Sequence, residues 1–407
     1  MDHLVVNKKV FSLGIERCFL GRENEEIDVV KNISDGLFSV ISSIKAKVGI
    51  KADINSEICK VVGEKLLKKI DNNMELFQST NSNVILLITD RRTDPITPLL
   101  HSWNYQSLIH EFLGIENNVV KLSENKSIVI DERNDSFFAD NLYLDFGSLG
   151  GAIQNLEQNA RSQTTDLKDI KDIEGLKKFI HNYPITQKKI AIASKHSEIG
   201  GIISKKVKEE SLFDFCQFEQ SLVVDNNQNS HFNTVISYIN NSSITNENAL
   251  RISLLYCVKY LNNENNRIDE IKLELSKRPD GHVLESFIDK FIKWLPKNDA
   301  ISSRKSLLSK AISFMLNDDK KDAFRRYSPF LKKLIEKQFK DLPYQTIKEY
   351  PQNSDINQII VFFVGGTTYE EGSYAYNPEI TKALNTEIIV GGTTIHNMNS
   401  FVYKEIN

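Results

Sequence analysis

The sequence predicts an α/β protein with a large inserted, mainly α-helical domain, in which both chain ends build one discontinuous parallel-sheet domain. Nearly unbroken apolar runs near both ends are typical of strands buried on both faces. Amphipathic helices dominate the middle, where strand-like runs are scarce. The predicted domains are residues 1–115, the first part of the α/β domain, 116–350, the helical insertion, and 351–407, the second part.

The composition excludes several classes of protein. The chain has 407 residues, 40% of them hydrophobic, and a formal net charge of -3, which does not favour binding of a polyanion. Four widely spaced cysteines predict reduced, buried thiols in a cytoplasmic protein. No apolar run approaches the roughly 18 residues of a membrane span, and the start has no signal-peptide pattern. We therefore expect a soluble protein whose membrane association is indirect.

The N-terminal part predicts two helices, a strand and a third helix. Apolar residues recur at helical spacing over residues 33–48 and 58–70, and the run 84–88 is a buried strand. The loop after it contains Thr97 and Pro98, which predict a helix start with a hydroxyl cap and proline in the first position. Gly114 is expected to end that helix.

The loop at Asp90 has two interpretations. It follows a strand, where open α/β sheets place ligand sites, so Asp90 could be an acid in a catalytic crevice. Alternatively, Asp90 accepts backbone N–H bonds in a turn, and Arg91 pairs with a nearby acid.

Two C-terminal strands, residues 359–364 and 387–390, are each followed by Gly-Gly-Thr-Thr. The glycines are Gly365 and Gly366 in the first turn and Gly391 and Gly392 in the second. Such turns could hold phosphate, but neither has the lysine of a phosphate-binding loop. The other interpretation is a tight strand exit that needs positive φ.

The segment 324–337 predicts an amphipathic helix with one apolar and one basic face. It is either a partner-binding helix or an ordinary core-facing helix with a solvated basic face. If it binds a partner, the contacts are Phe324, Arg325, Arg326, Tyr327, Lys332 and Lys333.

An enzyme that uses the Asp90 loop and the Gly-Gly-Thr-Thr turns on a phosphorylated or nucleotide ligand is the alternative function. No general base, phosphate lysine or metal-ligand set converges in the sequence. His110 has no second histidine at zinc-protease spacing, and His196 and His396 have no companions at metal spacing. No catalytic residue, metal or cofactor is therefore predicted.

Several motifs occur together in a fixed order. The strand ending in Asp90-Arg91 is followed by Asp94 and by Thr97-Pro98-Leu99-Leu100. The two Gly-Gly-Thr-Thr turns continue as Tyr369-Glu370-Glu371 and as Ile395-His396-Asn397. In this order the motifs resemble the SM (Sec/Munc) family and, within it, the class of vacuolar protein sorting-associated protein 45.

The resemblance implies a non-enzymatic regulator of vesicle docking and membrane fusion that binds a syntaxin-type SNARE and assembling SNARE complexes. It implies a cytoplasmic protein, peripheral on Golgi and endosomal membranes, with no nucleic-acid or small-molecule ligand. In the family the inserted helical domain templates SNARE helices, so segments 324–337 and 182–207 become candidate contacts. Asp90, Arg91, Asp94, Thr97 and Pro98 would then be scaffold residues, together with the four turn glycines. Family members begin with an additional N-terminal α/β domain, which this sequence is expected to lack.

Overall fold

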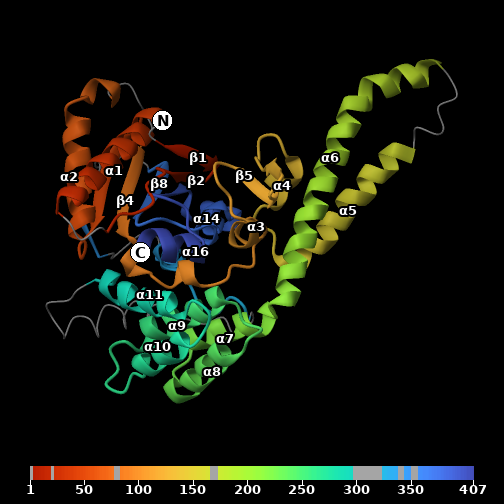
Figure 1. The fold of residues 1–407 in the computed structure, drawn as a ribbon. Helices are drawn as coiled ribbons and strands as arrows, with labels where there is room; N and C mark the ends of the chain where they lie inside the picture. The colour runs from red at the N-terminus through yellow and green to blue at the C-terminus, as the bar shows by residue number, and fades with distance from the viewer. Residues whose placement is uncertain are drawn as a thin grey trace. The chain divides into compact units, whose positions relative to one another are not determined.

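The computed structural model describes residues 3–19, 23–77, 83–165, 173–296, 323–337, 343–349 and 356–407. The chain forms two compact units, one from residues 1–100 with 214–407 and the other from residues 101–213 (Figure 1). These limits follow contacts within the chain, whereas the predicted limits at residues 116 and 350 follow the change of secondary structure.

A seven-stranded sheet of order β1-β2-β9-β8-β4-β3-β7 is the centre of the first unit. β4 pairs in parallel with β8, from Val84 opposite Gln358 to Asp90 opposite Val364. The two chain ends therefore fold into one sheet, as the sequence predicts. The strands are β1 (Leu4–Asn7), β2 (Val10–Ser12), β3 (Lys47–Asp53), β4 (Asn83–Asp90), β7 (Tyr344–Lys348), β8 (Gln358–Val364) and β9 (Glu387–Gly392).

The prediction of a parallel sheet is correct only for the five central strands. β1 is antiparallel to β2, and β7 is antiparallel to β3, so both edges differ and the sheet is mixed. β7 lies inside the segment assigned to the helical insertion. It has no long apolar run because an edge strand is only half-buried, and it therefore lacks the signal that identified β4 and β8.

The core of this unit lies between the sheet and two helices, α1 (Glu23–Ile44) and α2 (Glu57–Asp71). Alternate strand residues such as Ile50, Leu86 and Phe362 face these helices, as the two-residue period of a strand requires. The Phe11 ring stacks on Phe362 at 6.0 Å between ring centres.

Short helices complete the α/β part of the unit, and longer ones form its helical part. The short ones are the 3₁₀ turns η1 (Met74–Phe77), η2 (Arg91–Thr93) and η3 (Thr97–Leu99), then α14 (Tyr369–Tyr376), α15 (Pro378–Leu384), α16 (Met398–Ser400) and the π-helix Phe401–Ile406. The helical part has α7 (Leu212–Val224), α8 (Gln228–Asn240), α9 (Asn246–Tyr260), α10 (Ile268–Ser276), α11 (Gly281–Trp294) and α13 (Phe330–Glu336).

The helix predicted to start at Thr97 begins later. Thr97–Leu99 forms only a 3₁₀ turn, and the α-helix α3 runs from Tyr105 to Leu113 with Asn104 as its cap. The Thr97 hydroxyl donates to Asp94, at 2.5 Å, so it does not cap a helix. Gly114, at φ +72°, ends α3 as predicted.

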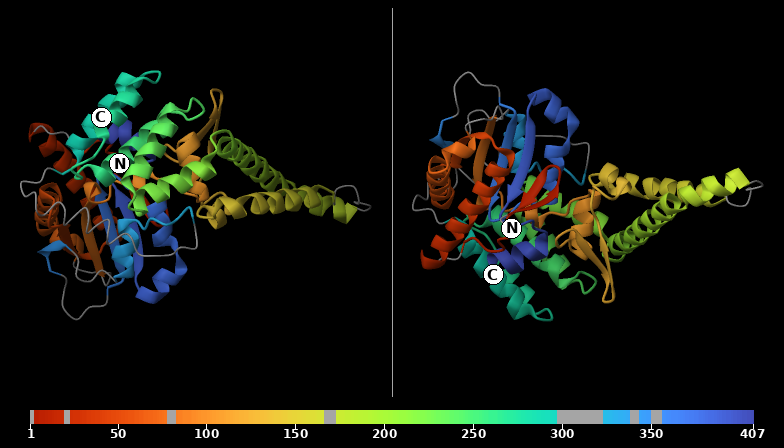
Figure 2. Two further views of the ribbon diagram at one scale, coloured as in Figure 1. Left: turned by 90° about the horizontal axis from the view of Figure 1, so that it is seen from below. Right: turned by 90° about the horizontal axis from the view of Figure 1, so that it is seen from above.

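The second unit contains α3, the hairpin of β5 (Val119–Ser123) and β6 (Lys126–Val129), and α4 (Ser136–Asn141). Two long helices, α5 (Phe146–Thr165) and α6 (Ile173–Glu209), lie side by side (Figures 1 and 2). Gly200 of α6 allows their close approach, because a Cβ atom there would lie 2.5 Å from Cδ1 of Ile153. Among the described residues, no helix is long and apolar enough to span a membrane.

Candidate functional site

Asp90 closes the turn at the end of β4. Its carboxylate accepts the N–H of Arg92 at 2.8 Å and the hydroxyl of Ser56 at 2.6 Å, and it forms an ion pair with the Arg92 guanidinium. Ser56 is the cap of α2, so Asp90 connects the strand end to the start of that helix. The turn interpretation of Asp90 is confirmed.

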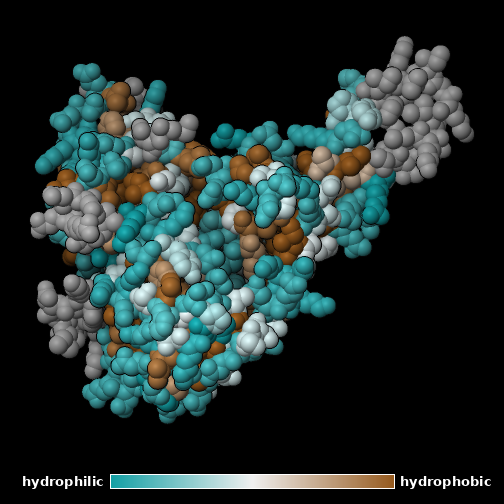
Figure 3. All heavy atoms as spheres, viewed as in Figure 1, coloured by the Kyte–Doolittle hydropathy of each residue, from teal (hydrophilic) through white to brown (hydrophobic). Residues whose placement is uncertain are grey.

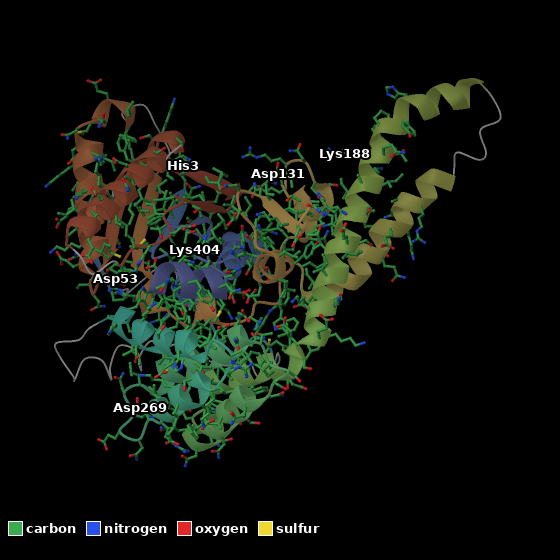
Figure 4. All side chains as sticks on the ribbon, viewed as in Figure 1. His3, Asp53, Asp131, Lys188, Asp269 and Lys404 are labelled. Atoms are coloured by element: carbon green, nitrogen blue, oxygen red, sulfur yellow. The ribbon has the colours of Figure 1, made fainter. Side chains whose placement is uncertain are left out.

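Asp53 ends the neighbouring strand β3, and its carboxylate also forms hydrogen bonds within the chain (Figure 4). It accepts the Thr93 hydroxyl at 2.9 Å and the Asn55 N–H at 3.0 Å, and burial raises its pKa to about 6. The Phe19 ring lies under the Arg92 guanidinium, 3.9 Å from the ring centre. Side chains of this chain thus occupy the edge of the sheet at which an enzyme with an open α/β sheet would bind its ligand.

Arg91 connects the first sequence motif to the first Gly-Gly-Thr-Thr turn. Its guanidinium donates to both carboxylate oxygens of Glu371, at 2.8 and 2.9 Å, and both side chains are fully buried. Glu371 also accepts from Thr367 and from the Thr368 N–H, which completes the capping box of α14. The predicted pairing of Arg91 with an acid is confirmed, and the acid comes from the other end of the chain.

Asp94 connects the same loop to the segment predicted to bind a partner. One carboxylate oxygen accepts the Tyr327 hydroxyl at 2.8 Å, and the other accepts the Phe330 N–H at 3.0 Å. Because Phe330 is the first residue of α13, Asp94 satisfies an N–H group at the start of that helix. Three motifs that are distant in the sequence therefore meet around Arg91 and Asp94.

The two glycine pairs serve different purposes. Gly365 and Gly366 have φ +91° and +88°, which confirms the prediction of a strand exit with positive φ. Gly391 and Gly392 belong to β9 and have no positive φ, so the same prediction is wrong for them. They allow close packing instead, since a Cβ atom would lie 2.1 Å from Phe11 at Gly391 and 2.6 Å from the Thr367 nitrogen at Gly392.

The predicted contact segment is only partly helical and partly buried. Only Phe330–Glu336 is helical, so the continuous amphipathic helix over 324–337 is wrong. Tyr327 and Lys333 are buried, and burial lowers the pKa of Lys333 to about 8. The basic face of segment 324–337 is thus only partly solvated.

The other four predicted contacts are less buried. Phe324 and Arg326 are half-buried, and Arg326 pairs with Asp225 at 2.8 Å. Arg325 is exposed. Lys332 is partly exposed and lies 3.8 Å from Glu336.

The second candidate segment, 182–207, lies in α6, and residues 183–191 form its exposed section. Tyr183 is 46% exposed and Ile185 is 55% exposed, and both Lys188 and Lys189 are exposed. Figure 3 shows hydrophobic side chains along this part of α6, where Figure 4 labels Lys188. A helix that presents large apolar and basic side chains to solvent has the chemistry of a partner surface.

A buried hydrogen-bond chain anchors α6 just beyond this section. The Tyr105 hydroxyl lies 2.7 Å from Nδ1 of His196, and Nε2 of His196 lies 2.8 Å from Asp135, which also pairs with Lys195. Burial lowers the pKa of His196. The sequence analysis missed this anchor, because a histidine, a tyrosine and an aspartate more than 25 residues apart leave no local pattern.

The chain matches the family model described as the Sec1 family over residues 1–404. It is 31% identical to vacuolar protein sorting-associated protein 45 of Mus musculus over 430 residues, which cover 98% of this chain and 73% of that protein. The protein of the same name from Dictyostelium discoideum is 30% identical, with 98% of this chain and 74% of that protein covered.

A solved structure described as the SM protein Vps45 in complex with the Qa SNARE Tlg2 has a TM-score of 0.84 and 26% identity, over 99% of this chain and 75% of that one. The Unc18–syntaxin 1 complex from Monosiga brevicollis, at 18% identity and a TM-score of 0.74, shares the fold over 98% of this chain and 75% of that one. Taken with the meeting of the three motifs around Arg91 and Asp94, these matches show that the chain belongs to the Sec1 family.

Proposed function

We propose that this chain binds a syntaxin-type (Qa) SNARE and assembling SNARE complexes, and so regulates vesicle docking and membrane fusion without catalysis. The observation that carries the proposal is the similarity over 99% of the chain to Vps45 in complex with the Qa SNARE Tlg2. By the same similarity we assign the chain to the Vps45 class. Its place would be the cytoplasmic face of Golgi and endosomal membranes, in transport toward the vacuole, with membrane association through the SNARE.

For the contact surface, we propose residues within the helical segment 116–350. The exposed section of α6 offers Tyr183 and Ile185 to an apolar stripe on a partner helix, and Lys188 and Lys189 to acidic side chains beside that stripe. In segment 324–337, Arg325 and Lys332 remain proposed contacts. Tyr327 and Lys333 would act through their packing, because a buried side chain cannot touch a partner.

The experiment is a pull-down of the full chain against a panel of cytoplasmic segments of syntaxin-type SNAREs. The proposal predicts retention of at least one Qa SNARE and of none of the unrelated helical controls. Failure of every SNARE in the panel to bind would contradict it.

A thermal-shift screen with nucleotides tests the enzyme alternative. A nucleotide that stabilises the chain, with the effect lost in Asp90→Ala, would favour that alternative. We expect no such shift, because the Asp90 and Asp53 carboxylates already accept hydrogen bonds from Ser56 and Thr93.

A further inference from the structure

Residues 13–19, here called the strap, lie across the carboxyl ends of the central strands. The N–H groups of Leu13 and Ile15 donate to the carbonyls of Gly392 and Thr393 at the end of β9, at 3.1 and 2.7 Å. Phe19 packs against Gly365 at the end of β8, where a Cβ atom would lie 2.7 Å from its ring. Since Phe19 also lies under Arg92, the strap covers the ends of β4, β8 and β9.

A buried carboxyl group near the C-terminus holds the far end of the strap. One oxygen of Glu405 accepts the N–H of Cys18 at 3.1 Å, and the other lies 3.3 Å from Nε1 of Trp294. The Phe19 ring packs edge-on against Trp294, with 5.8 Å between ring centres. Glu405 thus joins the strap, α11 and the terminal π-helix, three segments that are distant in the sequence.

Burial of Glu405 disfavours a negative charge and outweighs the N–H groups of Cys18, Phe19 and Trp294, which favour one. Glu405 is fully buried, and among the described residues it forms no ion pair. The charged and titratable groups that face it are the Cys18 thiol on the strap and, at the end of β4, Asp90 and Arg92. Asp90 already engages the Arg92 guanidinium. From α11, the Trp294 indole contacts Glu405, and the nearby Lys290 bonds to Asn407. The nearby ion pair between Lys404 and Glu16 is exposed (Figure 4 labels Lys404).

We propose that Glu405 is a pH switch. The strap stays over the strand ends while Glu405 is protonated, and it is released when Glu405 ionises. An ionised carboxylate without a paired cation is costly to bury, whereas a solvated one is not. Opening of the strap would hydrate Glu405 and uncover the carboxyl ends of β4, β8 and β9.

Proton linkage predicts the size of the effect. Burial raises the pKa of Glu405 to about 8, above its ordinary value of 4.5. The closed strap therefore binds more protons than the open strap between these two values. Opening should become about tenfold more favourable for each pH unit up to about pH 8, and should level off above it.

The test is hydrogen exchange of the full chain between pH 6 and pH 9, with rates corrected for the intrinsic effect of pH. The protection factor of a peptide covering residues 13–19 should fall about tenfold per pH unit and level off near pH 8. Peptides from β8 should keep their protection. In Glu405→Gln, which cannot ionise, the protection of the strap should not depend on pH.

Glu16→Gln is the matched control, because it removes an exposed carboxylate from the strap, and it should behave as the wild type does. A flat wild-type profile would overturn the proposal, as would an equal slope in Glu405→Gln or an equal loss of protection in β8. If Glu405→Gln does not fold, the wild-type profile decides alone, by a slope that is confined to the strap or by its absence.

Discussion

The loop after β4 and the exposed section of α6 differ in how their polar groups are used. In the loop, Asp90, Arg91 and Asp94 are buried, and each forms hydrogen bonds to partners within the chain. In α6, Ile185 and Lys188 face solvent. The motif residues of the loop therefore bond within the chain, whereas the proposed partner surface faces solvent.

The largest effect is expected in the buried ion pair. Glu371→Ala should lower the free energy of unfolding by about 3–5 kcal/mol, because it leaves the Arg91 guanidinium buried without its main partner. Chemical denaturation measures this. Glu336→Ala, which removes an exposed carboxylate 3.8 Å from Lys332, is the control and should change stability by less than about 1 kcal/mol. Similar effects of the two variants would remove the contrast between scaffold and surface.

Two adjacent lysines of α13 provide the next comparison. Lys333→Glu should lower the free energy of unfolding by more than about 2 kcal/mol, because Lys333 is 4% exposed and a buried carboxylate there would lose its hydration. Lys332→Glu should cost less than about 1 kcal/mol, since Lys332 is partly exposed. Equal melting temperatures for the two variants would show that α13 does not bury Lys333.

A single hydroxyl tests the link between the loop and α13. Tyr327→Phe removes the hydrogen bond to Asp94 and should cost about 1.5–3 kcal/mol, the usual contribution of a buried hydrogen bond to a charged group. Tyr403→Phe, at a position 38% exposed, is the matched control and should have little effect on the denaturation midpoint. If the two variants unfold alike, Asp94 does not need the Tyr327 hydroxyl.

The stability that the buried His196 hydrogen-bond chain gives to α6 should depend on pH. Burial lowers the pKa of His196 below its ordinary value of 6.5, so the unfolded chain binds more protons there than the folded chain. The stability that neutral His196 contributes is complete above pH 6.5 and is lost as the pH falls from 6.5 toward the lowered value. Thermal unfolding of wild type and His196→Gln at pH 7.5 and 5.5 checks this.

The informative quantity is the difference between the stability losses of the wild type and of His196→Gln. Asp53, whose pKa is raised, changes stability with pH in the opposite direction in both proteins. The wild type should lose more stability than the variant at the lower pH, and an equal loss would exclude His196.

The sequence predicted the parts of the fold that depend on local patterns. β4 and β8 are apolar throughout because both faces are buried, and α1 and α2 have a clear helical period. It missed β1, β2, β3 and the half-buried edge strand β7, and it extended the first helix to Val48, which lies in β3. It also started α3 too early, because Thr97 bonds to Asp94 through its side chain.

The candidate site was harder to predict for a physical reason. Turn chemistry predicted that Arg91 pairs with an acid, but only the fold brings Glu371 to it across 280 residues. The burial of Tyr327 and Lys333 likewise follows from contacts with Asp94 and its neighbours, which no pattern in segment 324–337 contains.

The most direct test of the proposed function is the dissociation constant of the full chain for the Qa SNARE that it retains in the pull-down. The double variant Tyr183→Ala/Ile185→Ala should bind at least about tenfold more weakly, a loss of about 1.4 kcal/mol, with an unchanged melting temperature. Leu273→Ala/Val283→Ala, which truncates two exposed apolar side chains on α10 and α11, should bind as the wild type does. Wild-type affinity in the α6 variant would contradict the assignment of the partner surface to that helix.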